Sequence, residues 1–416
     1  MTIASPIVCL ITPGHVASTP RLVRSADALA EAGYGVHVVA GRHYPPADAL
    51  DAEILAKARW HYTLVDSRGG PAAMMRKLRR RFFRRMMLHP AFATTAVAAR
   101  AHHSEAARLA AAAARIPAQL FLGHCLAGLP AAAFAARARG VTYGYDAEDF
   151  HDAETESAIR DRAESSARRI LQSALLPGCI HLTAASPLIG KKFEEVYGVK
   201  ALTLLNVFPQ AEGPTVPTIP DGITEQRPAR FYWFSQTVGP GRGLEAVVAI
   251  MGRMRVPAEL HLRGFVTSDY MSHLGSVARQ HGMTRAITFL PPGSPSEMPR
   301  LAANADLGLS TEEAHPLSRD LCLTNKVFAY LLAGIPQLLS HTTAQAAFAP
   351  AIGDACLLCR LEKSEETAYQ LDEFFSNPAR VTAARNAAWA SARSQFCWDV
   401  EKNKLLASIG RSLSPV

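Results

Sequence analysis

The chain has 416 residues, of which 49% are hydrophobic and 19% charged, a balance typical of a globular protein. This length exceeds what one hydrophobic core usually holds, so we expect two domains of roughly 200 residues each. The formal net charge of +8 is local, because seven basic residues fall within residues 76–85 and the remainder carries +1. A charge confined to one segment argues against a general nucleic-acid-binding surface.

No targeting or membrane-spanning segment is expected. The longest apolar runs are strand-length and fall short of the ~20 residues that a bilayer-spanning helix needs. The N-terminus lacks the basic leader and long apolar core of a signal peptide, which predicts a cytoplasmic protein. The seven cysteines are scattered and odd in number, which favours reduced thiols. Cys356 and Cys359 lie in an apolar run without a nearby histidine, so packing is favoured over metal or redox work.

The first half of the chain alternates predicted strands and helices. A strand over residues 7–12, a helix over 21–33 and a strand over 36–41 form a βαβ unit, and the alternation returns at 118–123. These continuous Val, Ile and Leu runs predict a parallel sheet covered on both faces. We assign residues 1–208 to this domain and the proline-rich residues 209–228 to a linker.

The alternation restarts after the linker and predicts a second parallel domain over residues 229–385. Residues 386–416 are predicted to form a C-terminal helix that packs back on the first domain. The expected fold is therefore α/β, with two doubly wound, Rossmann-like domains facing across a cleft. Because open parallel sheets bind ligands at the carboxyl ends of their strands, we expect an active site between the domains.

Four motifs in the second half carry a family resemblance: WFSQTVGPGRGLE, LHLRG, ITFLPPGSPSEMPRLAANADLGLSTEE and LTNKVFAYLLAGIPQLLS. This region resembles the donor domain of GT-B glycosyltransferases, especially glycosyltransferase family 4. In the first half, LFLGHCLAGLPAA and YDAEDFHD are similar to the family's histidine-containing loop and the acidic loop that follows it. The resemblance implies transfer of a sugar from a nucleotide-diphosphate sugar, with retained configuration and without a metal or other cofactor. The implied acceptor is a sugar or lipid-linked sugar in cell-envelope polysaccharide or glycolipid synthesis.

A diphosphate is bound by basic side chains and helix N-terminal amides. The resemblance gives this role to Arg242 in the loop GPGRG and to Lys326 at the start of the helix NKVFAYLLAG, and it gives Glu312 the sugar hydroxyls. Further donor-binding residues implied are Gly239, Gly241, Gly243, Pro292, Gly293, Glu313, Thr324 and Asn325. A plainer interpretation, in which Asn325 caps the helix and Lys326 is a solvated charge, stays open.

Acceptor-side residues are implied in the first half. His124 follows a predicted strand, where its imidazole can bond the transferred sugar or simply pack. Asp146, Glu148 and Asp149 follow the next strand, and Arg21 in a first helical turn can meet an anion or be a surface charge.

Two positions depart from the family pattern. Relatives often have a glutamate for ribose where this chain has Ala329, and an arginine where it has Gln236. These departures keep open a catalytically lapsed protein that acts as a membrane-associated partner of another transferase. A nucleotide-sugar epimerase of GT-B architecture is a weaker alternative, because such relatives lack the NK helix and the basic segment.

The basic segment MMRKLRRRFFRRMM predicts an amphipathic helix with an apolar stripe along Met75, Leu78, Phe82 and Met86. Such a helix suits an anionic membrane surface, which predicts a peripheral location at the inner face of the cell membrane. The residues expected to contact the membrane are Arg76, Lys77, Arg80, Arg81, Phe82, Arg84 and Arg85. A solvated helix and nucleic-acid binding are the weaker alternatives.

Overall fold

The structure is a computed structural model that describes residues 5–153, 161–218, 222–283 and 287–413. The chain forms two compact units. Unit 1 comprises Met1–Leu204, Pro316–Ser318 and Lys402–Val416, and unit 2 comprises Leu205–His315 and Arg319–Glu401. Residues 219–221 of the predicted linker and residues 414–416 of the predicted C-terminal helix lie outside the described residues.

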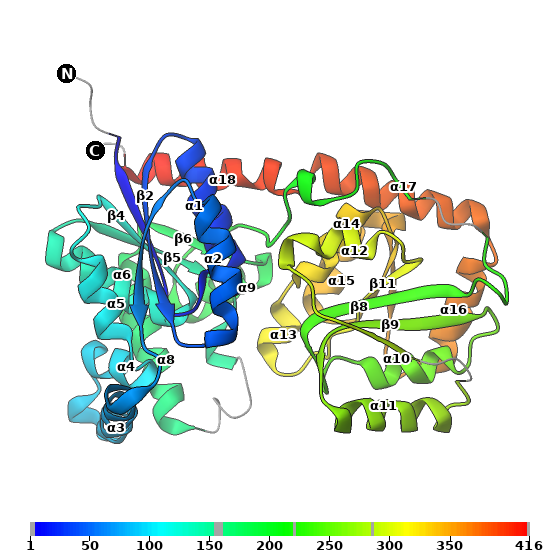
Figure 1. The fold of residues 1–416 in the computed structure, drawn as a ribbon, viewed down its shortest axis with the longest axis horizontal. Coiled ribbons are helices and arrows are strands. Elements are labelled where there is room, and N and C mark those ends of the chain that lie inside the picture. Colours follow the sequence, from blue (N-terminus) through cyan, green and yellow to red (C-terminus); the bar gives the residue numbers. More distant parts are fainter. Residues whose placement is uncertain (1–4, 154–160, 219–221, 284–286, 414–416) are drawn as a thin grey trace. The chain divides into compact units, whose positions relative to one another are not determined.

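Unit 1 is built on a seven-stranded sheet in the order β3-β2-β1-β4-β5-β6-β7, and every pairing in it is parallel. Helices lie on both faces, with α5 and α6 on one and α1 and α2 on the other (Figure 1). The strands are β1 (Ile7–Thr12), β2 (Gly35–Arg42), β3 (His61–Asp66), β4 (Leu120–His124), β5 (Thr142–Ala147), β6 (His181–Ala184) and β7 (Leu202–Thr203). The helices are α1 (Pro20–Glu31), α2 (Asp48–Lys57), α3 (Gly70–Met86), α4 (Thr95–His102), α5 (Ala106–Ala113), α6 (Cys125–Arg139), α8 (Arg162–Leu175) and α9 (Pro187–Tyr197).

Glycines bring α6 unusually close to the sheet of unit 1. A side chain at Gly123 would meet the backbone of Gly128 at 2.5 Å, and one at Gly128 would meet the carbonyl of Ile11 at 2.8 Å.

The chain turns from β4 into α6 within one residue, at Cys125, which has a φ of 55°. Among the described residues, Cys125 is the one non-glycine residue with positive φ, a conformation that costs about 1–3 kcal/mol. This tight turn places His124 at the carboxyl end of the sheet.

Unit 2 is built on a six-stranded parallel sheet in the order β10-β9-β8-β11-β12-β13. Helices α10, α11 and α16 cover one face and α12, α14 and α15 the other (Figure 1). The strands are β8 (Ala229–Val238), β9 (Ala258–Val266), β10 (Ile287–Leu290), β11 (Leu307–Ser310), β12 (Gln337–Ser340) and β13 (Cys356–Cys359). The helices are α10 (Leu244–Met251), α11 (Ser268–Gln280), α12 (Met298–Ala302), α13 (Leu317–Leu321), α14 (Asn325–Ala333), α15 (Thr343–Ile352), α16 (Ser364–Phe375), α17 (Pro378–Ser394) and α18 (Trp398–Leu413); residues 316–318 and 402–413 belong to unit 1.

Helix α14 is fixed against the sheet by Tyr330. The Tyr330 hydroxyl lies 3.1 Å from the carbonyl oxygens of both Tyr232 and Leu309. Its ring lies over Gly308, where a side chain would come within 2.3 Å of the ring. Helix α14 is therefore held directly against β8 and β11.

The C-terminal segment differs from the single helix that the sequence predicts. Residues 386–413 contain the end of α17 and all of α18, because Gln395 leaves the helical conformation with φ −138°. The residues after Glu401 belong to unit 1, where Ser408 Oγ lies 2.8 Å from His181 Nδ1 and Ile409 is buried.

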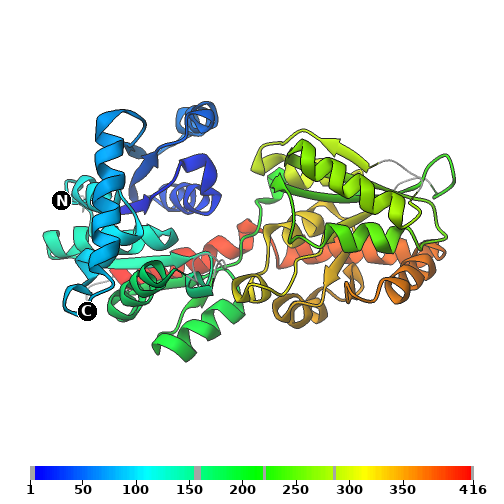
Figure 2. The ribbon, with the colours of Figure 1, turned by 90° about the horizontal axis from the view of Figure 1, so that it is seen from below.

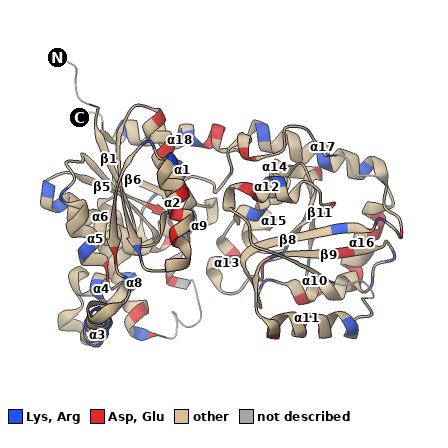
Figure 3. Cartoon of the chain, viewed as in Figure 1, with Lys and Arg blue, Asp and Glu red and all other residues tan. Residues whose placement is uncertain are grey.

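Acidic and basic residues are interspersed over the helices of both units (Figure 3). Among the described residues, no helix is long and apolar enough to cross a membrane. None of the seven cysteines forms a disulfide.

Candidate functional site

A glycine-rich loop at the carboxyl end of β8 presents Arg242. Gly243, with a φ of +68°, leaves no room for a side chain, since its Cβ would lie 2.2 Å from the carbonyl oxygen of Thr311. The Thr311 hydroxyl donates to the carbonyl of Arg242 at 3.0 Å. Arg319 donates from Nη1 to the carbonyl of Gly241 at 2.6 Å. The loop is thus held in one conformation before α10 begins.

Arg242 and Lys326 converge on one carboxylate. Lys326 Nζ lies 2.6 Å from Glu312 Oε1, and Arg242 Nη1 lies 3.1 Å from Glu312 Oε2. The side chains of Glu312 and Lys326 are 1% and 5% exposed, whereas that of Arg242 is 33% exposed. The ammonium group of Lys326 also lies 5.3 Å from the centre of the Trp233 ring, within the range of a cation–π contact. These four residues form the Arg242 cluster.

The Arg242 cluster carries an excess of positive charge. Burial would raise the pKa of Glu312, but Lys326 and Arg242 outweigh burial and hold that pKa below its usual value. With Glu312 ionised, two cations face one anion at the N-terminus of α14, where the helix dipole adds further positive potential. The arrangement is suited to a polyanion such as a diphosphate.

The other predicted donor residues border this cluster less closely. The N-cap of α14 is Thr324, whose hydroxyl oxygen lies 3.3 Å from that of Ser310, and Asn325 is the first helical residue. Within the described part of the chain, the side chain of Asn325 has no hydrogen-bond partner, so it is not a cap. Glu313 is exposed next to Glu312. Pro292 and Gly293 are exposed in the loop after β10. At Gly239, a Cβ atom would have no neighbouring atom within 4 Å.

The structure places no carboxylate where the family has its ribose glutamate. Ala329 is completely buried in α14, so a longer acidic side chain would have no room or partner there. Gln236 is exposed on β8, next to a shift in strand register between Phe234 and Thr237. Asp320, an acidic residue shortly before α14 in the chain, cannot readily replace that glutamate, because its carboxylate accepts hydrogen bonds from the backbone amide and the hydroxyl of Thr343.

In unit 1, Arg21 and His124 both bind Asp146. Arg21 donates from Nε and Nη2 to the two oxygens of Asp146 at 2.9 and 2.6 Å, and from Nη1 to the carbonyl of Leu204 at 2.9 Å. His124 Nδ1 lies 3.2 Å from Asp146 Oδ2. Burial would raise the pKa of Asp146, but Arg21 and His124 hold it well below its usual value. Arg21 is thus a buried structural partner of Asp146, neither a surface charge nor freely available to an anion.

The buried polar atoms of this region that lack a hydrogen-bond partner among the described residues include His124 Nε2 and Glu148 Oε1. Burial raises the pKa of Glu148 to about 7. Asp149 is half-buried beside Glu148. The ligating atoms of His124, Asp146 and Glu148 lie within 4.8 Å of one another, as in a metal site. Arg21 already occupies both Asp146 oxygens, however, so the hydroxyl groups of a ligand suit His124 Nε2 and Glu148 Oε1 better than a cation does.

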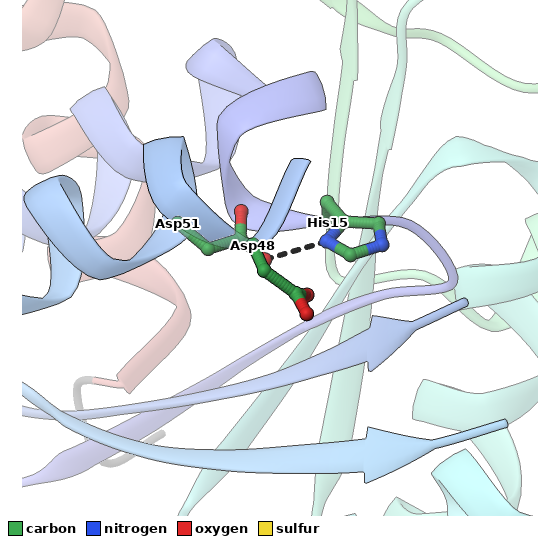
Figure 4. Close-up of side chains that lie close together, drawn as sticks. All are labelled: His15, Asp48 and Asp51. Atoms are coloured by element: carbon green, nitrogen blue, oxygen red, sulfur yellow. Dashed lines mark hydrogen bonds and ion pairs between the residues drawn. The ribbon is translucent and has the colours of Figure 1, made fainter. Parts of the chain in front are cut away.

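A second cluster surrounds His15, which lies in the loop after β1 (Figure 4). The backbone amides of His43 and Tyr44 donate to His15 Nε2 at 3.0 and 2.9 Å, so Nε2 is an acceptor and Nδ1 carries the proton. That proton is donated to Asp51 Oδ2 at 2.6 Å, and Asp51 Oδ1 accepts from the amide of Ala17. With both ring nitrogens engaged, His15 fixes the loop and does not ligate a metal.

Neither a protein-family model nor a curated protein sequence matches this chain. Solved structures do match it. HepE of Anabaena, in complex with UDP and glucose, superposes with a TM-score of 0.70 at 13% identity, covering 98% of this chain and 100% of that one. A glycosyltransferase from Rickettsia africae matches with a TM-score of 0.70 at 11% identity over 100% of both chains. This chain has the GT-B fold.

The GT-B fold confirms the predicted fold class of two Rossmann-like α/β domains with parallel sheets. It also hosts other chemistry. A putative UDP-N-acetylglucosamine 2-epimerase from Listeria monocytogenes matches with a TM-score of 0.58 at 13% identity, over 100% of this chain and 99% of that one. At these identities the likeness establishes the fold, and function has to be argued from the side chains.

Sequence reasoning overlooked three supporting residues in unit 2. Arg319 and Thr311 hold the glycine loop, and Trp233 contacts Lys326. Each of the three looks like an ordinary loop, helix or strand residue in the sequence. The one available signal was proximity to the quoted motifs, since Thr311 directly precedes Glu312 and Trp233 opens the first motif.

Proposed function

We propose that the chain is a glycosyltransferase that moves a sugar from a nucleotide-diphosphate sugar to an acceptor hydroxyl. The observation that carries the proposal is the Arg242 cluster, in which two cations surround one buried carboxylate at the N-terminus of α14. The GT-B fold supports the proposal, and HepE, a protein with a similar structure, has been crystallised in complex with UDP-glucose. In this proposal a donor diphosphate binds Arg242 and Lys326, and Glu312 is released to accept hydrogen bonds from sugar hydroxyls.

The proposed reaction needs neither a metal nor another cofactor from the protein. The bond between the anomeric carbon and the diphosphate oxygen breaks, the acceptor oxygen bonds the same face of the sugar, and the acceptor proton passes to a leaving phosphate oxygen. Arg242 and Lys326 stabilise the charge that builds up on the leaving diphosphate. In unit 1, His124 Nε2 and Glu148 are the groups proposed to bind sugar hydroxyls. The acceptor class is a sugar or lipid-linked sugar of the cell envelope.

The test begins with thermal unfolding in the presence of UDP-, GDP- and ADP-sugars, since a ligand that binds only the folded protein raises its melting temperature. The stabilising donor is then incubated with acceptor sugars and lipid-linked sugars, and release of the nucleoside diphosphate is measured. The proposal predicts one preferred base, turnover by the native protein, and turnover reduced at least about 100-fold in Arg242→Ala. Absence of any stabilising donor, or equal turnover by both proteins, would refute it.

A second candidate, a catalytically lapsed protein that binds donor as a partner of another enzyme, is favoured by one observation. Ala329 is buried and leaves the α14 site without the expected carboxylate. Tight donor binding without turnover of any acceptor would support this alternative. A third, epimerase activity, is supported only by a fold neighbour, and it requires conversion of the donor sugar without an acceptor.

A further inference from the structure

The basic residues of α3 fall into two groups with different surroundings. Three of them, spaced four residues apart, turn toward the rest of unit 1. Arg76 Nε lies 2.8 Å from Glu105 Oε1, and Arg84 pairs with both Asp161 and Glu164. Arg80 donates from Nε to the carbonyl of Ala101 at 3.0 Å. Arg80 Nη2 also lies 3.5 Å from Glu164 Oε2. The charges of these three arginines are therefore paired within the fold.

The other four basic residues of α3 turn outward. Lys77, Arg79, Arg81 and Arg85 are exposed, and within the described part of the chain their side chains form no ion pair. The positive charge of this helix that remains available to a partner is thus carried by these four residues. This separation differs from the sequence expectation, which included Arg76, Arg80 and Arg84 among the membrane contacts.

The same outward face of α3 also exposes large apolar side chains. Met74, Met75, Leu78 and Phe82 are 67%, 57%, 46% and 60% exposed. At 100° per residue these four positions fall within one stripe, with Lys77 and Arg81 on one side of it, Arg79 on the other and Arg85 within it. The predicted stripe member Met86 is half-buried and does not take part. Figure 2 shows α3 along its length at the periphery of unit 1, and it packs against α4 and α8.

We propose that this outward face is a docking surface for an anionic lipid bilayer. The helix lies in the plane of the membrane, its four apolar side chains enter the headgroup region, and its four unpaired cations meet lipid phosphates. A stripe of exposed apolar residues that is mostly aliphatic is unfavourable in water and gains little from the phosphate backbone of a nucleic acid, whereas the acyl boundary of a bilayer takes it up. This proposal is independent of glycosyl transfer, because none of its residues belongs to the Arg242 cluster.

The experiment is co-sedimentation of the full-length protein with two kinds of vesicle, phosphatidylcholine alone and phosphatidylcholine mixed with phosphatidylglycerol. We expect binding to the mixed vesicles only, weakened by added salt. The variant Lys77→Gln, Arg79→Gln, Arg81→Gln, Arg85→Gln is expected to bind at least about tenfold more weakly. The variant Leu78→Ser, Phe82→Ser is expected to lose binding to a similar degree.

The matched control removes four exposed charges elsewhere in unit 1, at Arg137, Arg139, Lys191 and Lys200, and it should bind as the native protein does. Equal loss in this control would show that binding follows total charge and would overturn the proposal. Unchanged binding of the Leu78→Ser, Phe82→Ser variant, or tighter binding to double-stranded DNA than to the mixed vesicles, would also overturn it. Far-ultraviolet circular dichroism of each variant confirms that the fold is retained.

Discussion

Lys326 is the most informative residue of unit 2. A buried ammonium group is costly unless it is paired, and the N-terminus of a helix is the less favourable end for a cation. Here Glu312 pairs with it and Trp233 contacts it. In the proposed function, the lysine has a further role, because an anionic ligand replaces Glu312 as its partner.

Substituting Lys326 with methionine keeps most of the length of the side chain but leaves Glu312 with Arg242 as its one cationic partner in the cluster. We expect Lys326→Met to lower the free energy of unfolding by about 3 kcal/mol, because removing one member of a buried pair strands the other. Adding Glu312→Gln should recover part of that loss, since the stranded charge is removed. Urea denaturation of the single and double variants measures both effects. A double variant whose loss equals the sum of the two single losses would contradict the pairing.

Glu148 predicts a pH dependence of opposite sign to that of Glu312 and Asp146. Its pKa in the folded state is about 7, above the usual value of 4.5, so the folded state binds the proton more tightly than the unfolded state. The protonated carboxyl is stabilising at low pH, and this contribution is lost as the pH rises from about 4.5 to about 7.

We therefore expect Glu148→Gln to be more stable than the native protein at pH 8 and close to it at pH 4.5. The measurement is the free energy of unfolding of both proteins in urea across this range. A difference between them that does not change with pH would show that Glu148 titrates normally. Glu312 and Asp146, whose pKa values are lowered, contribute stability that is lost only in more acidic solution.

The loop between β8 and α10 shows how an element holds a site residue in place. Gly243→Ala would force a side chain into a positive-φ position and against the carbonyl of Thr311. We expect a loss of about 2 kcal/mol or more in the free energy of unfolding and weaker nucleotide binding. Gly239, in the same loop, has open space and no positive φ, so Gly239→Ala is the matched control and should cost at most about 0.5 kcal/mol. Equal effects of the two substitutions would contradict the observed loop conformation.

Helix α3 allows a similar comparison between adjacent arginines. Arg84 is paired with Asp161 and Glu164, whereas Arg85 faces solvent. We expect Arg84→Gln to lower the free energy of unfolding by about 1–2 kcal/mol, because it leaves buried Glu164 with fewer cations. Arg85→Gln should change it by at most about 0.5 kcal/mol. Chemical denaturation of the two variants separates these outcomes, and a larger loss for Arg85→Gln would reverse the assigned orientation of the helix.

Local patterns predicted the elements well and the partners of the charged side chains poorly. The predicted strand over residues 7–12 coincides with β1, the predicted strand over residues 36–41 lies within β2, and the helix NKVFAYLLAG is α14, which ends at the left-handed C-cap Gly334. The partners of the charged residues could not be predicted. Arg21 and Asp146 are separated by 125 positions, and Arg242 and Glu312 by 70. Such pairs depend on strand order and helix rotation, and neither is encoded in a short window of sequence.

At the scale of the whole molecule, the two units carry different parts of the candidate chemistry. Unit 2 holds the Arg242 cluster, and unit 1 holds His124, Glu148 and the outward face of α3. The chain enters unit 2 after Leu204 and its last residues belong to unit 1, so neither unit is one continuous segment. Variants of the full-length chain are therefore better tests than isolated domains.

The most direct test of the proposed function is calorimetric titration of UDP, GDP and ADP into the full-length protein. We predict that one of these nucleotides binds, and that Arg242→Ala weakens its binding by about 10- to 100-fold, the range for a hydrogen bond to a charged group. Arg255→Ala, which removes an exposed arginine of unit 2 outside the cluster, should leave the affinity unchanged. Equal affinity of the Arg242→Ala variant and the native protein, or no binding of any of the three nucleotides, would contradict the assignment of the Arg242 cluster to a nucleotide diphosphate.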